Sequence, residues 1–387
     1  MIWPKTPSQN TPIAAGASPQ ASAPCPATRV IGIGLASIVG DQPFALLGAV
    51  GTLLSGASPD PVISLPVQGQ EGERPAMTAA IAELEGIDHP AQRIEIMAVE
   101  ALAKACGSAT ATKFGDKTLV MTLLPAQSSP RGAVVQGDEL MAALKDQLPE
   151  LAEAQFRFAE TSSGSVGHLI QACRELVENT WETVIFGGVD SLVDPVSCTE
   201  LALAGRLMTL GGVEGLVPGE GAAYLVLQAA QNPAANSQKN LLAKIQAAAQ
   251  APEPNSGRAD SKPMAGLAAA IQQALAHAGL QGGKPGGVVL PLGAETCGTL
   301  EWYQATQKVW QPDKGENSGA ALQEIPPEEL LSHLTLGELG AATLPFALAL
   351  ACARFEFEHP ALETILACDA GDDQHRGAVL LQSPNNR

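Results

Sequence analysis

The sequence predicts an α/β protein that consists of two halves of similar kind. A chain of 387 residues exceeds the length at which a single hydrophobic core stops growing. Strand-like apolar runs alternate with segments of helical spacing, a pattern typical of layered α/β domains with much parallel sheet. This alternation starts again after a polar, Pro- and Asn-rich stretch at residues 231–262. We therefore expect a flexible Pro/Ala/Ser-rich arm over residues 1–28, a first half over residues 29–235 and a second half over residues 236–387.

The first half opens with an apolar run of small residues, typical of a buried strand. Helical spacing follows it and ends at Ser55-Gly56. Further along, Gly107 follows an amphipathic segment and is a typical residue at the end of a helix. In chain order we expect strand 30–39, helix 44–54, helix 93–106, strand 118–124, helix 166–179, strand 183–187, helix 199–207 and strand 222–228.

The second half repeats this alternation on either side of a turn at Gly282-Gly283-Lys284-Pro285. In chain order we expect strand 241–247, helix 264–278, strand 287–292, polar loop 311–327, helix 340–353, strand 362–368 and strand 377–381.

The charge balance excludes some classes of partner. Hydrophobic residues make up 45% of the chain and charged residues 16%, which is enough apolar material for a globular fold. A formal net charge of -18 argues against binding a nucleic-acid backbone, because no basic surplus is present to displace counterions. The same acidity disfavours an anionic membrane surface, and each apolar stretch is too short to span a bilayer. We expect neither nucleic acid nor membrane as a partner.

The cysteines indicate the compartment. Seven are present, without a CxxC pair and far apart in the chain, so the sequence indicates neither a zinc site nor a disulfide framework. The N-terminus has no basic segment followed by a long apolar core, so no signal peptide is indicated. We expect a cytoplasmic protein with no metal and no cofactor. The cysteines are Cys25, Cys106, Cys173, Cys198, Cys297, Cys352 and Cys368.

Four blocks of the sequence are informative in their order along the chain. They are RVIGIGLASIVG (residues 29–40), FGGVDSLV (residues 186–193), VPGEGAAYLVL (residues 217–227) and TLGELGAAT (residues 335–343). Together they resemble the ketoacyl synthase branch of the thiolase-like superfamily. This resemblance implies a thiolase-like fold, with two similar βαβαβ halves in an αβαβα layered arrangement.

The resemblance also implies that the catalytic set is missing. A ketoacyl synthase holds a cysteine at a helix N-terminus, where the helix dipole and free amides favour a thiolate and bind a developing oxyanion. Two histidines complete its chemistry. The matching positions in this chain are Ser162 for the cysteine, and Leu292 and Glu338 for the histidines. His333 matches the lysine of active relatives and is expected to be a polar pocket residue. We expect no catalytic residue, because serine without a base is a weak nucleophile and leucine transfers no proton.

The remaining candidate residues have ordinary structural explanations. Cys173 is expected to be a small buried hydrophobe, and His168 a packed, hydrogen-bonded helix residue. Cys297 beside Glu295 has no histidine in its block. The glycine-rich residues 217–221 lack the spacing of a phosphate-binding loop and are expected to lead into a strand.

Two departures from the resemblance concern the acyl pocket. The connection over residues 208–216 is shorter than the segment that shapes this pocket in active relatives, so we expect the acyl tunnel to be absent or rebuilt. Residues 367–377 occupy the place of a gating loop with an aromatic gate, yet they carry acids and no aromatic residue. We do not expect gating of a fatty chain.

Three functions fit these observations. The first is a catalytically inactive binding partner or adaptor, because degenerate relatives resemble the thiolase-like accessory proteins of type VI secretion. The second is a chain-length-factor-like subunit that pairs with an active ketoacyl synthase and its acyl carrier protein. The third is an acyltransferase that uses Ser162 with Glu338 or His333 as base. The first two imply a homodimer or heterodimer, for which we expect residues 183–187 to lie at or near the pairing edge of a sheet.

Overall fold

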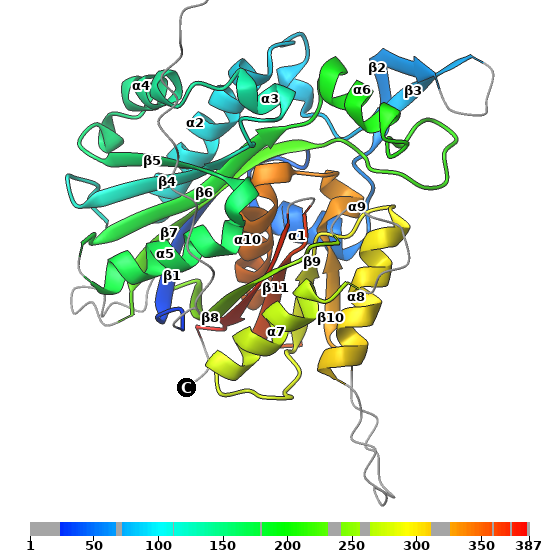
Figure 1. The fold of residues 1–387 in the computed structure, drawn as a ribbon. Coiled ribbons are helices and arrows are strands. Elements are labelled where there is room, and N and C mark those ends of the chain that lie inside the picture. The colour runs from blue at the N-terminus through cyan, green and yellow to red at the C-terminus, as the bar shows by residue number, and fades with distance from the viewer. Residues whose placement is uncertain are drawn as a thin grey trace, which may run out of the picture.

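A mixed sheet of ten strands forms the centre of the protein (Figure 1). The computed structural model describes residues 24–66, 72–110, 112–178, 180–230, 241–255, 264–310, 326–357, 360–371 and 374–384. The strand order is β10-β9-β11-β12-β8-β1-β7-β6-β4-β5. The strands of the first half are β1 (Thr28–Ser37), β4 (Thr118–Leu124), β5 (Gln155–Glu160), β6 (Thr183–Ser191) and β7 (Glu220–Ala229). Those of the second half are β8 (Ala243–Pro252), β9 (Gly287–Leu290), β10 (Glu328–Leu331), β11 (Thr364–Asp369) and β12 (His375–Gln382).

The two halves of the sheet have the same topology. In each half the second strand pairs in parallel with the third and fourth strands, and the fifth pairs antiparallel with the fourth and first. A short antiparallel contact of residues 28–30 in β1 with residues 243–245 in β8 joins the halves. The sheet is therefore mixed: β4 and β9 pair in parallel with both of their neighbours, as the prediction of much parallel sheet requires, and the other pairings are antiparallel. Apolar periodicity reports burial of a strand but not the direction of its neighbours.

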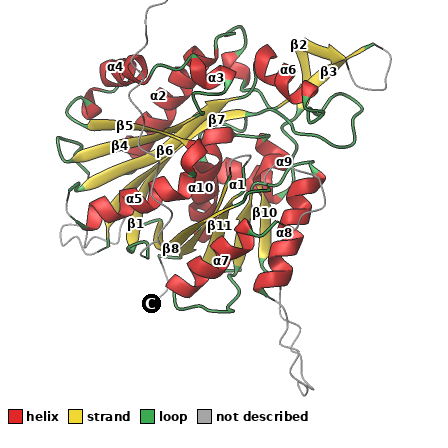
Figure 2. Ribbon diagram, viewed as in Figure 1, coloured by secondary structure: helices red, strands yellow, loops and turns green. Residues whose placement is uncertain are grey.

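The helices complete five layers (Figure 2). The middle layer consists of α5 and α10, which share one hydrophobic core with strands of both halves. Helices α2 and α4 cover the outer face of the first half, and α7 packs with α8 on the outer face of the second. The predicted thiolase-like arrangement is confirmed. The helices are α1 (Pro43–Gly51), α2 (Pro90–Ser108), α3 (Pro130–Ala133), α4 (Gly137–Gln147), α5 (Ser165–Val177), α6 (Pro195–Leu203), α7 (Gly266–His277), α8 (Thr296–Val309), α9 (Ser332–Leu336) and α10 (Thr343–Phe355).

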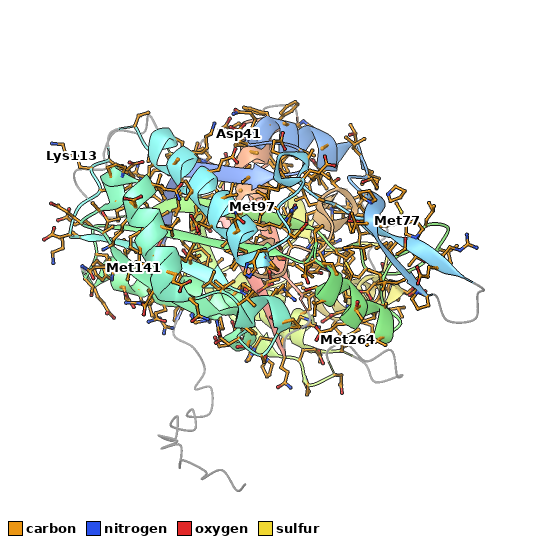
Figure 3. All side chains as sticks on the ribbon, turned by 90° about the horizontal axis from the view of Figure 1, so that it is seen from above. Asp41, Met77, Met97, Lys113, Met141 and Met264 are labelled. Carbon is orange, nitrogen blue, oxygen red and sulfur yellow. The ribbon has the colours of Figure 1, made fainter. Side chains whose placement is uncertain are left out.

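Shorter elements connect this framework. Four 3₁₀ helices are described, and a separate two-stranded sheet projects from the body, with Met77 labelled in Figure 3. That hairpin comprises β2 (Ser58–Pro66) and β3 (Glu73–Thr78). The 3₁₀ helices are η1 (Ala82–Leu84), η2 (Pro149–Leu151), η3 (Thr161–Ser163) and η6 (Gly340–Ala342).

The expected elements differ from the observed ones mainly at their ends. Strand 118–124 is found at the predicted residues. The helix predicted at 199–207 begins instead at Pro195, because the carboxylate of Asp194 caps it by accepting N–H bonds from Val196 and Ser197. The helix predicted at 340–353 begins with a 3₁₀ turn. The elements α4, α8, β5, β10 and the β2–β3 hairpin were not predicted.

Strand β6 does not lie at an edge. It pairs with β4 on one side and β7 on the other, so the prediction of a pairing edge at residues 183–187 was wrong. Within the described part of the chain, β5 is the edge strand of the first half, paired with β4 alone. The fully buried pattern of residues 183–187 reflects a central strand.

Some expectations lie outside the described residues. They are most of the arm at residues 1–28, the half boundary at residues 235 and 236, and most of the loop at residues 311–327. Among the residues that are described, no helix is long and apolar enough to cross a membrane.

Candidate functional site

A cleft of about 430 Å³ opens at the carboxyl ends of β4, β5, β6 and β11. This edge is where ligands commonly bind in α/β sheets. Loops from both halves contribute, so the cleft lies where the two halves meet. Its polar lining consists of Ser129, Arg131, Thr161, Ser162, Ser165, Ser197, Glu200, Glu338 and Asp369.

Ser162 lies in the turn between β5 and α5, exposed and facing this cleft. Its hydroxyl donates to a carboxylate oxygen of Glu160, at 3.3 Å. The neighbouring Ser163 has the histidine contact instead, because its Oγ lies 2.7 Å from Nε2 of His168. Burial lowers the pKa of His168, although a hydrogen bond to the carbonyl oxygen of Glu160 opposes this effect. The imidazole of His168 therefore lies within hydrogen-bond distance of Ser163 and not of Ser162. Ser163 is not among the residues that line the cleft.

The N-terminus of α5 is already occupied by a side chain from β8. The N–H of Gly167 donates to Oε1 of Gln250 at 2.6 Å, and Nε2 of Gln250 donates to the carbonyl oxygen of Ser163 at 3.1 Å. Gly164 precedes the helix with φ of +91°, and a Cβ there would collide with Gln250. Free first-turn amides are what an oxyanion site needs. Here the side-chain oxygen of Gln250 accepts the N–H of Gly167, one of these amides.

A buried carboxylate holds the floor of the cleft in place. Asp190, at the end of β6, is fully buried and accepts hydrogen bonds from Nε of Arg131 at 2.8 Å, from Ser191 N–H at 2.9 Å and from Ala341 N–H at 3.0 Å. Burial disfavours the charge of Arg131, but Asp190 and Glu338 outweigh this and raise its pKa. Arg131 is therefore charged, and it is engaged by Asp190.

A second, smaller hollow adjoins the cleft at Glu338. Its volume is about 70 Å³, and Leu292, His333 and Glu338 line it. Nδ1 of His333 lies 3.4 Å from Oε2 of Glu338, and Nε2 lies 3.4 Å from Oγ1 of Thr343. The structure thus brings Ser162, Leu292, Glu338 and His333 around two adjoining hollows, although they are far apart in the chain. Whether they are the degenerate catalytic positions stays a prediction.

The short connection at residues 208–216 borders the smaller hollow through Leu216, and residues 208–212 line a further cavity of about 250 Å³. Leu216 N–H donates to the carbonyl oxygen of Arg206, and the Arg206 guanidinium binds the Glu295 carboxylate at 2.7 and 2.9 Å. An apolar cavity of about 150 Å³ binds benzene in a well-studied case. By itself the hollow of about 70 Å³ lacks room for a long acyl chain, whereas the adjoining cleft is larger.

Other candidate residues have structural surroundings. Cys173 is fully buried in the core, and the Glu295 beside Cys297 is bound by Arg206. The backbone of Gly219 packs against residues 336–338 just before β7 begins. In the block at residues 367–377, Asp369 and Gly371 line the cleft, while residues 372 and 373 lie outside the described part.

Sequence reasoning missed Arg131, Asp190, Gln250 and Ser197. Asp190 stands in the block FGGVDSLV, where an acid at the end of an apolar strand was a usable signal. Gln250 gave no signal, because it ends a run of alanines that reads as a plain strand. Within the described residues no group of three or more His, Cys, Asp or Glu side chains is arranged to hold a metal ion.

Solved structures with the same architecture include ketosynthases and a ketosynthase/chain length factor. The ishigamide ketosynthase/chain length factor matches with a TM-score of 0.67 at 15% identity, covering 92% of this chain and 99% of that one. A type II polyketide synthase acyl-carrier protein in complex with its ketosynthase bound to the hexaketide matches with a TM-score of 0.70 at 14% identity, covering 93% and 100%. The ketosynthase from module 6 of the bacillaene synthase of Bacillus subtilis 168 matches with a TM-score of 0.71 at 14% identity, covering 92% and 72%.

No protein-family model matches the sequence, and no curated protein matches it. The likeness therefore lies in the fold. The chain has the thiolase-like fold of ketosynthases and chain length factors, over almost its whole length.

Proposed function

We propose that this chain is a non-catalytic protein of the ketosynthase fold that acts by binding a partner protein. The observation that carries the proposal is the set of residues at the two adjoining hollows. Ser162, Leu292 and Glu338 line these hollows, and the resemblance implies that they replace the thiol and the two imidazoles that condensation requires. The Ser162 hydroxyl donates to the Glu160 carboxylate, and among the described residues no imidazole forms a hydrogen bond with it, so the histidine base that usually activates a serine is missing.

The electrostatics of the cleft support the same proposal. Glu338 would disfavour a thiolate or a developing oxyanion beside it, since like charges in a partly buried site repel. Gln250 binds a first-turn amide of α5 that could otherwise donate to such an oxyanion. Restoring the cysteine alone, by Ser162→Cys, is therefore expected to leave the protein without condensing activity.

The partner is expected at the sheet edge of the first half. Strand β5 is partly exposed and, within the described residues, is paired on one side only. An unpaired edge is available for another strand. We propose that β5 pairs with a second copy of this chain or with a homologue. A monomer whose mass in light scattering is independent of concentration, with no partner recovered from the native host, would contradict this.

Two kinds of partner are distinguished by capture from the native host. The resemblance to type VI secretion accessory proteins makes a secretion effector or adaptor the partner that we propose first. A chain-length-factor-like role is the second candidate, because solved structures of similar fold include a ketosynthase/chain length factor. The short connection at residues 208–216 argues against that second role, since such subunits usually keep more of the acyl-pocket wall. Recovery of an active synthase with its acyl carrier protein would reverse the ranking.

The non-catalytic proposal is tested by intact-mass spectrometry. The purified protein is incubated with malonyl- and acyl-loaded carrier protein, beside the Ser162→Ala variant and the matched neighbour Ser163→Ala. We expect no adduct on any of the three and no release of carbon dioxide. A stable acyl adduct that disappears in Ser162→Ala would overturn the proposal in favour of an acyltransferase. An adduct lost only in Ser163→Ala would overturn it as well and would assign the chemistry to the contact with His168.

A further inference from the structure

The cleft carries more negative than positive charge. Among its lining residues, Glu200, Glu338 and Asp369 are acids, and Arg131 is the only cation. Arg131 is held by the buried carboxylate of Asp190, so its charge is already compensated. A cationic group that enters the cleft therefore meets a favourable field, which the walls of the cleft shield from water.

One residue that lines the cleft has a buried polar atom without a hydrogen-bond partner in the described part of the chain, and a second such atom lies three residues earlier in the chain. Oγ of Ser197 makes no hydrogen bond to any described residue, although Ser197 is only 3% exposed and lines the cleft. Oδ2 of Asp194, in the residue that caps α6, is likewise without a hydrogen-bond partner among the described residues, at 4% exposure. Leaving such an atom unsatisfied costs about 1–3 kcal/mol. A hydrogen-bond donor on a ligand would satisfy Ser197.

The surroundings of the acids favour an organic cation. The described residues include no group of three or more ligands that could hold a metal ion. Helix α6 lies at the surface, beside α3 and the β2–β3 hairpin (Figure 1). Val196 and Leu203 lie on the same helical face as Glu200 and are 55% and 84% exposed. Apolar side chains therefore flank the acid that borders the cleft.

We propose that the cleft receives a lysine or arginine side chain from a partner polypeptide. The ammonium or guanidinium group lies between Glu200 and Glu338 and donates to Oγ of Ser197. Apolar residues next to the basic residue pack on Val196 and Leu203. This inference rests on the proposed role of the chain as a binding protein, and it names the chemistry of the partner.

The probe is a short acetylated peptide of alanine and leucine with one central lysine, labelled with fluorescein and followed by anisotropy. The control peptide has norleucine in place of lysine. We expect the lysine peptide to bind at least tenfold more tightly, because a charge-assisted hydrogen bond is worth about 1.5–3 kcal/mol. Its affinity falls as salt is raised.

Four variants test where the lysine binds. Glu200→Gln and Glu338→Gln each weaken binding about tenfold, and Ser197→Ala weakens it severalfold. Both glutamines keep the size of the side chain, and Glu200 is exposed on α6, so the fold is retained. The matched control is Glu139→Gln, which removes an exposed acid from α4 and leaves binding unchanged.

Four outcomes would overturn the proposal. If the lysine and norleucine peptides bind equally, the cationic group contributes nothing to binding. Equal loss in Glu139→Gln and Glu200→Gln shows attraction to the net charge alone. Binding of n-butylamine as tightly as the peptide would make this a small-amine site. A wild-type protein that takes no acyl group and binds no peptide refutes the cation site and leaves the non-catalytic proposal standing.

Discussion

Replacing Gly188 by alanine tests how the floor of the cleft is built. A Cβ at this position of β6 would lie 2.2 Å from the carbonyl oxygen of Ala341 and 3.2 Å from Cβ of Leu123. Contact distances between non-bonded atoms are about 3.5 Å, so the peptide at Ala341 has to move by about 1 Å. The N–H of the same residue, in the preceding peptide group, donates to Asp190 at 3.0 Å, and movement of Ala341 weakens this bond.

The cost follows from these two effects. Overpacking a core costs about 1–3 kcal/mol, and a buried hydrogen bond contributes about 1 kcal/mol. We therefore expect Gly188→Ala to lower the free energy of unfolding by about 2–4 kcal/mol. Urea unfolding, followed by circular dichroism, measures this as a lower midpoint with an unchanged slope.

A second glycine supplies the control. Gly48 is exposed in α1, and a Cβ there meets no atom within 4 Å. Gly48→Ala should raise the free energy of unfolding by about 0.5–1 kcal/mol, because alanine loses less conformational entropy in a helix. If Gly188→Ala unfolds at the wild-type urea midpoint, the turn at residues 340–342 moves without cost. The close contact between Gly188 and Ala341 then has no role in stability.

Three further outcomes are expected. Arg131→Met leaves Asp190 buried without its counter-charge and should lower the free energy of unfolding by about 2–4 kcal/mol in urea; recovery of part of this loss in the double variant with Asp190→Asn is required. Burial opposes the charge of Glu253, but three backbone N–H donors, Gly266 among them, outweigh it and lower its pKa. The ionised Glu253 therefore stabilises the fold above the ordinary carboxyl pKa, and this stabilisation is lost as the pH falls through the lowered pKa of the folded state. Glu253→Gln should make the free energy of unfolding depend less on pH on the acid side. Curves of equal slope for the variant and the wild type would count against this. Burial lowers the pKa of His168, so the contribution of this residue to the free energy of unfolding is complete above about pH 6.5 and is lost as the pH falls below that value. His168→Asn should reduce this loss of stability. An equal loss between pH 7 and 5 in the variant and the wild type would contradict the prediction.

The local chemistry of the chain was enough to predict the layers. Residues 118–124 are apolar except for two threonines, a composition typical of a strand buried on both faces, and the strand was found where predicted. Resemblance of short blocks then indicated the thiolase-like arrangement, and the solved structures of similar fold confirm it. The resemblance also singled out Ser162, Leu292 and Glu338, of which only Glu338 lies within these blocks, and the structure places the three residues at adjoining hollows.

Edge strands and weakly apolar helices were harder to predict. Strand β5 has charged residues within a short segment, because one side of it is not covered by another described strand. Helix α4 buries only Leu140 and Leu144, so its apolar stripe is narrow. Such elements carry a weak periodic signal. The pairing edge was expected at residues 183–187 from the resemblance alone, and these residues lie in the central strand β6.

The sequence by itself determined the fold class, the apolar layers and the residue types at the candidate site. Only the tertiary structure decided which groups meet there. Asp190 binds the backbone of Ala341, 151 residues further along the chain, and Gln250 binds Gly167 across 83 residues. Periodicity describes how each segment faces the core, whereas these bonds depend on how separate segments approach one another in space. The acidic cleft follows from that approach, because its carboxylates come from segments that share no local pattern.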